Sequence, residues 1–250
     1  MSENPYLPPT THVEANSSLP RHPGQGSPYG AYRETGPWAM IVTICLGIYL
    51  VGSLILVLTS WMELNNINAG NYDEFYDEES FIDRADMLVG SFIQYFFYVI
   101  AFLWGVWINK TCKNAWLINS RDGATAMYRG RESFTPGWAV GWYFMPVLSL
   151  WKPYQTMAWI RDASQKPLGL TMGKLVGLWW TFWILGAVVQ AVMITIFNQA
   201  ETTQDIGMAH RLFVATSPFD FLSTIFAALV VLRMSKIQKI RATELDLISN

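Results

Sequence analysis

One feature of this sequence constrains its folding more than any other: from Gly36 to Met62 there is no Asp, Glu, Lys or Arg. A helix needs about 20 apolar residues to cross the roughly 30 Å hydrocarbon core of a bilayer, so this stretch is long enough to span one. Residues 87–109 and 175–198 form two more charge-free stretches. Trp38 and Trp61 bracket the first, as expected for tryptophans at a membrane interface. The pattern predicts an all-α integral membrane protein.

A fourth span is expected at 218–235, although only Phe221–Leu232 within it is free of charged residues. Ser217, Pro218 and Asp220 fit an N-cap, a first-turn proline and a capping-box acid. We therefore expect a helix to begin here. On this interpretation Asp220 lies at a helix end rather than inside the membrane.

A fifth apolar stretch, Ser133–Trp151, is interrupted by two prolines. Lysine and arginine near span ends accumulate on the cytoplasmic side of a membrane. If this stretch does not cross, every lysine and arginine except Arg84 and Arg211 lies on one side; if it crosses, the bias vanishes. We therefore predict four transmembrane helices with both termini cytoplasmic. A proline-broken re-entrant or interfacial elbow at about 137–160 would then lie between spans 2 and 3.

The chain ends differ from the middle in composition. Proline, serine and glycine are concentrated before the first span, in a stretch too poor in apolar residues to offset the entropy of ordering. The expected organisation is a disordered cytoplasmic tail at 1–36, a membrane bundle at 37–236 and a cytoplasmic C-terminal tail at 237–250. The bundle's spans are expected at about 38–61, 87–109, 175–198 and 218–235.

Composition excludes several classes of function. Apolar residues make up 52% of the chain and charged residues only 14%, against about 25% charged in a typical globular chain. A net charge of -2 excludes a strongly basic nucleic-acid-binding protein. Two cysteines and three scattered histidines do not make a cysteine- or histidine-based metal centre. No hydrolase, phosphate-binding or dinucleotide-binding motif occurs, and we expect no cofactor.

The loop after the first span is strongly acidic. Carboxylates at this density are potential ligands of a divalent cation, but their spacing matches no known calcium loop. The sequence therefore does not predict a specific metal site here. The acidic residues are Glu63, Asp73, Glu74, Asp77, Glu78, Glu79, Asp83 and Asp86.

Small residues recur every four positions at Gly169, Gly173, Gly177 and Thr181, leading into the third span. On a helix this spacing places them on one face, where another backbone can approach closely. The simpler interpretation is helix packing within the chain, against another span or the elbow. The alternative is the face of a homodimer.

The richest motif is the segment FTPGWAVGWYFMPVLSLWKPYQTMAWIRDAS, which begins at Phe134. Its prolines break the run into short helices, and basic residues follow the apolar part. The candidate site, for a ligand or lipid or for a structural motif, consists of Trp138, Trp142, Pro146, Trp151, Lys152, Pro153, Tyr154, Gln155 and Arg161.

This segment resembles a bacterial family of four-span membrane proteins, described as a domain of unknown function (DUF4328). The resemblance implies four spans in a bacterial cytoplasmic membrane and no established activity. The order of apolar segments between about Trp38 and Lys236 also agrees with the family. The resemblance rests on Pro136, Gly137, Trp138, Ala139, Val140, Gly141, Trp142, Phe144, Pro146, Leu150, Trp151, Pro153, Tyr154, Gln155 and Ser164.

Two interpretations of the elbow remain open. In the first, its tryptophans and prolines are architectural and fix the segment against the bundle. In the second, Lys152 and Arg161 supply positive charge for an anionic lipid head group at the inner leaflet. The expected function is a binding or interaction protein, a scaffold or sensor in contact with the bilayer and with a possible membrane or homo-oligomeric partner. The alternative is a small transporter or channel subunit, with Gln94 and Gln190 as polar pathway elements. A third hypothesis is a membrane enzyme that acts on lipid.

Overall fold

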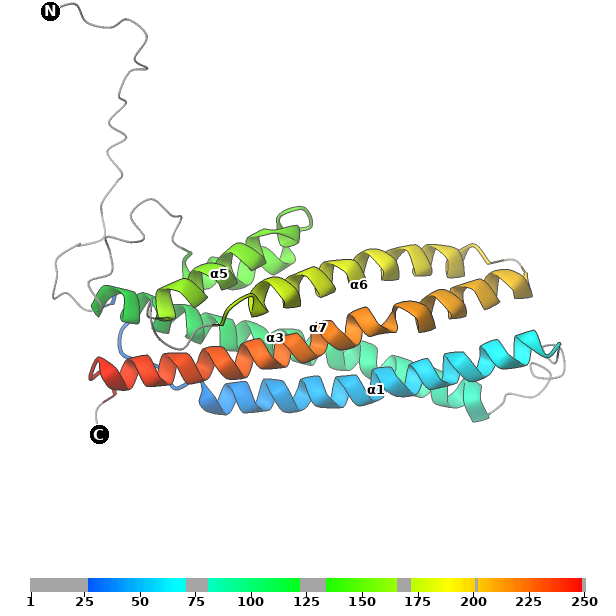
Figure 1. Ribbon diagram of the computed structural model, residues 1–250, viewed down its shortest axis with the longest axis horizontal. Helices are drawn as coiled ribbons and strands as arrows, with labels where there is room; N and C mark the ends of the chain where they lie inside the picture. The colour runs from blue at the N-terminus through cyan, green and yellow to red at the C-terminus, as the bar shows by residue number, and fades with distance from the viewer. Residues whose placement is uncertain (1–26, 71–80, 122–133, 166–171, 201, 249–250) are drawn as a thin grey trace, which may run out of the picture.

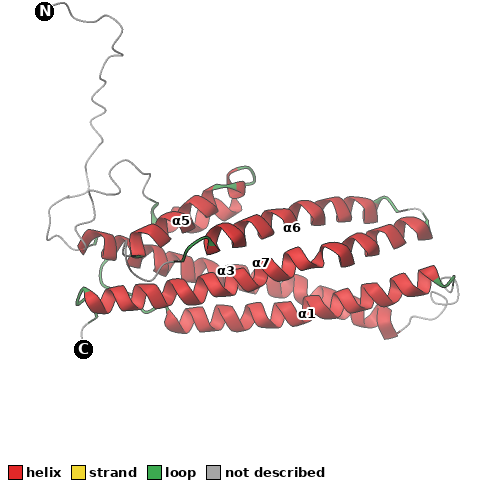
Figure 2. Cartoon of the chain, in the orientation of Figure 1, coloured by secondary structure: helices red, strands yellow, loops and turns green. Residues whose placement is uncertain are grey.

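The computed structural model describes residues 27–70, 81–121, 134–165, 172–200 and 202–248. All regular secondary structure in these ranges is helical, as Figure 2 shows. The all-α prediction is confirmed. Four helices are long: α1 (Gly36–Asn68), α3 (Phe81–Arg121), α6 (Leu175–Asn198) and α7 (Thr203–Glu244). Between α3 and α6 lie four short elements: α4 (Pro136–Gly141), η2 (Trp142–Phe144), η3 (Leu148–Leu150) and α5 (Lys152–Ser164).

The long helices have the length and hydropathy of membrane spans, and four such helices occur in the described part of the chain. Their side chains are mostly directed outward: only 6% of the most apolar window of α6 and 28% of that of α7 is buried within the protein. Apolar helices with so little protein around them require lipid to cover them. The protein is therefore a multi-pass membrane protein.

The long helices run side by side along the molecule (Figure 1). α7 packs against both α6 and α1, and α1 packs in turn against α3. We call one end of the bundle the loop end. It contains the C-termini of α1 and α6 and the N-termini of α3 and α7. The opposite end, the basic end, contains the C-terminus of α7 and the N-terminus of α1. The core is concentrated toward the basic end, around fully buried Trp107, Met157, Val176 and Met234.

The fourth span is part of a longer helix than expected. α7 begins at Thr203, and Thr202 forms the capping box with Asp205: its hydroxyl accepts a hydrogen bond from the Asp205 amide at 3.2 Å. The predicted helix start at Ser217 is therefore wrong. Pro218 lies within the helix, and Asp220 is enclosed in it rather than placed at its end.

The helix continues through Pro218 because a side chain replaces the missing amide. Proline has no N–H to donate to the carbonyl four residues earlier. That carbonyl belongs to Val214, and the Ser217 hydroxyl donates to it at 2.9 Å. Hydroxyl side chains commonly satisfy carbonyls freed by proline in membrane helices.

Part of each predicted tail is ordered. Ser27–Thr35 packs against α3: Tyr29 lies 5.9 Å from Trp116, ring to ring, and the Arg33 amide donates to Asn114 Oδ1 at 2.9 Å. Residues 1–26 lie outside the described residues. At the other end, α7 extends through most of the predicted C-terminal tail, to Glu244.

Candidate functional site

The elbow expected at about 137–160 extends from residue 136 to residue 164 in the structure, and the name is used for this range from here on. It is a helical hairpin whose helix starts and turn coincide with its prolines. Pro136 occupies the first turn of α4, where Thr135 is the N-cap and accepts from the Trp138 amide at 3.4 Å. The chain turns at Pro146, and Pro153 occupies the first turn of α5. A proline in a first turn removes no hydrogen bond, so these positions start helices rather than break them.

Side chains of α3 hold the first arm of the elbow. Asn109 donates to the Pro136 carbonyl at 3.0 Å, and Trp104 donates to the Tyr143 hydroxyl at 3.3 Å. A Cβ atom at Gly105 would lie only 3.2 Å from Val140, so glycine lets α4 approach α3 closely here. The turn is bonded to α6, where Trp180 donates to the Leu150 carbonyl at 3.2 Å.

Both ends of the elbow lie at the basic end. Its start is bonded to Asn109 of α3, and at its end the Ser164 hydroxyl accepts from Gln238, which also donates to the Thr111 carbonyl. Asn109 and Thr111 are two residues apart on one helix. The elbow therefore enters and returns at the same end of the bundle, as Figure 1 shows, and does not run the length of the long helices.

Lys152 lies over an aromatic wall. Its Nζ is 5.7 Å from the centre of the Phe134 ring and 5.6 Å from that of Trp142. Trp142 stacks on Trp138 at 4.7 Å between ring centres. An ammonium over aromatic faces is attracted by their quadrupoles. The Trp142 indole N–H is buried, and no described residue accepts a hydrogen bond from it.

The tip of the elbow is apolar and exposed. Phe144 is 76% exposed and Val147 66%, while Leu150 and Trp151 are also exposed. Tyr154 is partly buried against the core, and Gln155 is exposed. An apolar tip next to membrane-spanning helices is suited to contact with lipid.

Arg161 is separated from Lys152. The two are nine residues apart on α5, which is about 13 Å along the axis and roughly half a turn around it. Arg161 Nε pairs with Asp162 Oδ1 at 2.7 Å. The structure therefore does not bring the two basic side chains together on one face.

A buried polar network that the sequence did not predict joins the elbow to the bundle. Fully buried Gln238 of α7 donates to the Thr111 carbonyl at 2.8 Å and to the Ser164 hydroxyl at 2.9 Å. Asn114 donates to the Arg33 carbonyl at 2.7 Å and to Gln238 at 3.3 Å. One amide side chain thus links α3, α5 and α7, and its neighbour adds the segment before α1. Polar residues at helical spacing just beyond the apolar spans are the sequence pattern that could have predicted this network.

The predicted glycine stripe does not form one helix face. Gly173 precedes α6 and has a φ of +53°, a conformation that favours glycine. No described residue lies within 4 Å of the Cβ position at Gly173 or Gly177. The described part of the chain therefore does not pack closely on these two glycines, and Gly169 lies outside that part. The homodimer face remains a proposal.

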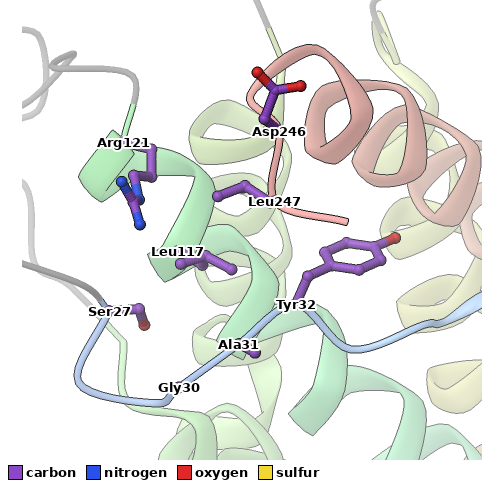
Figure 3. A pocket seen from close by; sticks show the side chains of 8 residues that line it. All are labelled: Ser27, Gly30, Ala31, Tyr32, Leu117, Arg121, Asp246 and Leu247. Atoms are coloured by element: carbon purple, nitrogen blue, oxygen red, sulfur yellow. The ribbon is translucent and has the colours of Figure 1, made fainter. Parts of the chain in front are cut away.

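A shallow hollow of about 270 Å³ lies at the basic end, between the segment before α1, the end of α3 and the residues after α7 (Figure 3). Arg121 and Asp246 lie on two different sides of the hollow, and Tyr32 lies on a third side. Burial raises the pKa of the Tyr32 phenol, so this side chain is neutral at physiological pH. The hollow is open, and its lining includes only two charged side chains.

The remaining candidate site residues, the potential metal ligands and two glutamines, do not form a cluster among the described residues. No group of three or more potential metal ligands occurs among the described residues, and Asp73, Glu74, Asp77, Glu78 and Glu79 of the acidic loop lie outside them. Gln94 and Gln190 both have exposed side chains.

Four membrane-capable helices and a helical elbow define the class: a helical multi-pass membrane protein. The chain belongs to the family described as a domain of unknown function (DUF4328), whose model matches residues 79–236. The match includes all of α3, the elbow and α6, and α7 except for its last turns. No curated protein and no solved structure matches the chain.

Proposed function

We propose that this protein is a binding protein of a bacterial cytoplasmic membrane, with its basic end in the cytoplasm, and that its elbow holds an anionic lipid head group at Lys152. The observation that carries the proposal is the position of the Lys152 ammonium over Phe134 and Trp142, next to an exposed apolar tip. This combines a cation with a surface that acyl chains can cover.

The distribution of charge supports the orientation. Arg84 and Arg211 lie toward the loop end, while the other described lysines and arginines flank the spans at the basic end or belong to the elbow. Positive residues accumulate on the cytoplasmic side. Both described chain ends would then be cytoplasmic.

The depth of the elbow supports lipid contact. Trp104, which bonds the elbow's first arm, is five residues inside Asn109, the last residue of the expected second span. Five residues correspond to about 7 Å along a helix, so the tip would lie within the hydrocarbon layer. The Lys152 side chain extends back toward Phe134, whose carbonyl accepts from Trp116 beyond the span end, at 2.8 Å. In this arrangement the ammonium would lie at head-group depth.

Two features next to Lys152 favour an anion. The N-terminus of α5 has no side-chain cap, and a helix N-terminus carries partial positive charge. The buried indole N–H of Trp142 has no acceptor among the described residues. Arg161 adds charge to the same leaflet, but it lies nine residues and about half a turn from Lys152 on α5, so we expect it to contribute less.

The test is the lipid that co-purifies with the protein. We expect Lys152→Gln to reduce anionic lipid adducts in native mass spectrometry several-fold, because each basic residue near an anionic surface contributes about 1 kcal/mol. Arg161→Gln is the matched control and should reduce them less. The double variant should retain its fold and membrane insertion. If it retains the parent's adducts, the elbow is architectural and the lipid site does not exist.

One observation favours the alternative of a small transporter or channel subunit. A carboxyl side chain, Asp220, lies inside α7 rather than at its end. Ionisable residues inside membrane segments commonly mark ion or proton pathways.

A further inference from the structure

Two exposed amide side chains lie at the same depth on two membrane-spanning helices. Gln94 of α3 is sixteen residues from Lys110, and Gln190 of α6 is sixteen residues from Lys174. These lysines end the charge-free stretches of the two helices at the basic end, and sixteen residues of helix are about 24 Å. In the other direction the charge-free stretches continue to residues 87 and 198. Both amides therefore lie well inside the spans.

A contact between the two helices agrees with this depth. Trp104 of α3 and Trp179 of α6 lie 5.3 Å apart, ring to ring, near the basic end. Gln94 is ten residues from Trp104 toward the loop end, and Gln190 is eleven residues from Trp179 in the same direction. The two distances along the helices are about 15 Å and 17 Å, so the amides are level to within one helical turn.

The elbow covers the same faces of these helices nearer the basic end. On α3 it packs at Gly105, and Gln94 is eleven residues, or about three turns, away on the same face. On α6 it is bonded at Trp180, and Ala191 is likewise eleven residues away. Gln94 and Ala191 are both exposed, so the elbow does not cover these faces toward the loop end.

The uncovered face of α3 is polar although it lies within a membrane span. Ser91, Gln94 and Tyr98 are spaced as i, i+3 and i+7, which places them on one side of a helix. All three are exposed, Tyr98 by 63%, and no described residue forms a hydrogen bond with the Gln94 amide. Acyl chains neither donate nor accept hydrogen bonds, so an amide facing them is costly. This face therefore favours a polar partner over lipid.

The uncovered face of α6 combines an amide with small side chains. Ala187, Gln190 and Ala191 are all exposed there, and no described residue forms a hydrogen bond with the Gln190 amide. Alanines allow the backbone of another helix to approach, so that an amide can bond across the contact. Gly177 is thirteen residues from Gln190 and lies on a different side of α6, so the predicted glycine stripe is not part of this face.

A second copy of the chain supplies the partner that both faces require. An amide has a donor and an acceptor, so two amides satisfy each other. A half-turn about the membrane normal keeps every residue at its own depth. It therefore brings Gln190 of a second copy level with Gln94 of the first, and Gln94 of the second level with Gln190 of the first. One symmetric contact would pair all four amides.

We propose that the protein forms a two-fold symmetric dimer in the membrane, in which α3 of each copy packs against α6 of the other. Gln94 hydrogen-bonds Gln190 of the partner copy at both contacts. Ala187 and Ala191 let the partner's α3 approach closely. The dimer does not depend on lipid binding at the elbow.

Cross-linking between two differently tagged chains tests this pairing and excludes links within one chain. Both chains lack Cys45 and Cys112; one contains Ser91→Cys and the other Ile194→Cys, at the same depth to within one residue. Both amides remain in place. We expect oxidation in membranes to give a disulfide-linked product with both tags. Val192→Cys is the matched control: it is as exposed as Ile194, 49% against 47%, but lies on the other side of α6, and it should not link.

Three results of this experiment would contradict the pairing. They are equal linkage through Ile194→Cys and Val192→Cys, no linkage through either, and preferential linkage between two chains that both contain Ser91→Cys. The last would mean that α3 packs against α3.

Purified protein in lipid vesicles tests whether a second copy alone is sufficient. Single-molecule photobleaching of labelled chains, at increasing dilution in lipid, measures the fraction of dimer. Gln190→Met removes the amide at similar side-chain length, and because the contact occurs twice we expect the dissociation constant to rise about tenfold. Gln199→Met, just after the end of α6, is the matched control and should leave the constant unchanged. A monomer at every dilution, or an unchanged constant in Gln190→Met, would overturn the proposal.

Discussion

Gly173 and Gly177 are four residues apart in the same stripe of small residues, but their backbones differ. Gly173 precedes α6 with a φ of +53°, whereas Gly177 lies within the helix. Neither Cβ position has a neighbour within 4 Å among the residues that the structure describes. The two sites therefore differ in backbone conformation rather than in crowding by the described residues.

Alanine substitutions at these two glycines should have opposite effects. We expect Gly173→Ala to destabilise the protein by about 1–2 kcal/mol, because a Cβ disfavours a left-handed backbone. Gly177→Ala should be neutral or stabilising, since alanine is the better helix former. Thermal unfolding in detergent measures both. A loss at Gly177 as large as that at Gly173 would instead indicate a second chain packed on this face.

At the scale of elements, one buried amide connects helices that are far apart in sequence. Gln238 of α7 bonds α3 through the Thr111 carbonyl and α5 through Ser164. Water does not reach this side chain. A polar group that lost its hydrogen bond to Gln238 would therefore destabilise the folded protein. The elbow is thus held both by its contacts with α3 and α6 and by this network.

Replacing this amide by an apolar side chain of similar size should weaken the attachment of the elbow. We expect Gln238→Leu to cost about 1–3 kcal/mol, because the Thr111 carbonyl and Asn114 lose a buried partner. Gln190→Leu is the matched control, since Gln190 is exposed on a membrane-spanning helix. Thermal unfolding of the two variants in the same detergent is the measurement. Equal stability would show that the network contributes nothing measurable.

At the scale of the whole molecule, the arrangement of charge and spans predicts which surfaces face the cytoplasm. The elbow begins and ends at the basic end, so Gln165 after α5 and Gln204 at the start of α7 lie at opposite ends of the bundle. A membrane would place them on opposite sides.

Single cysteines at these positions test that arrangement. In a chain without Cys45 and Cys112, we expect an impermeant thiol reagent added to intact cells to label Gln204→Cys but not Gln165→Cys. Both should be labelled after the cells are opened. Labelling of Gln165→Cys from outside would mean that the elbow crosses the membrane or that the orientation is inverted.

Much of the elbow was predictable. Pro136, Pro146 and Pro153 mark its helix starts and its turn, because proline restricts the backbone wherever it occurs. The wall of Phe134 and Trp142 beside Lys152 was not, since it depends on how the two arms fold onto each other. The separation of Lys152 from Arg161 became evident only once α5 was known to continue unbroken between them.

By itself the sequence determined the class of protein and the number and approximate position of its apolar spans. Transfer into lipid is a sum over neighbouring residues, so a charge-free stretch is sufficient to predict a span. Only the tertiary structure decided that α7 continues through Pro218 and that Gln238 of this helix links α3 and α5. The link through Gln238 joins residues far apart in the chain and leaves no local pattern that shows which of them pair. Ser217 and Pro218 do form a local pattern, but it is compatible both with a helix start and with a continuous helix in which Ser217 bonds the Val214 carbonyl.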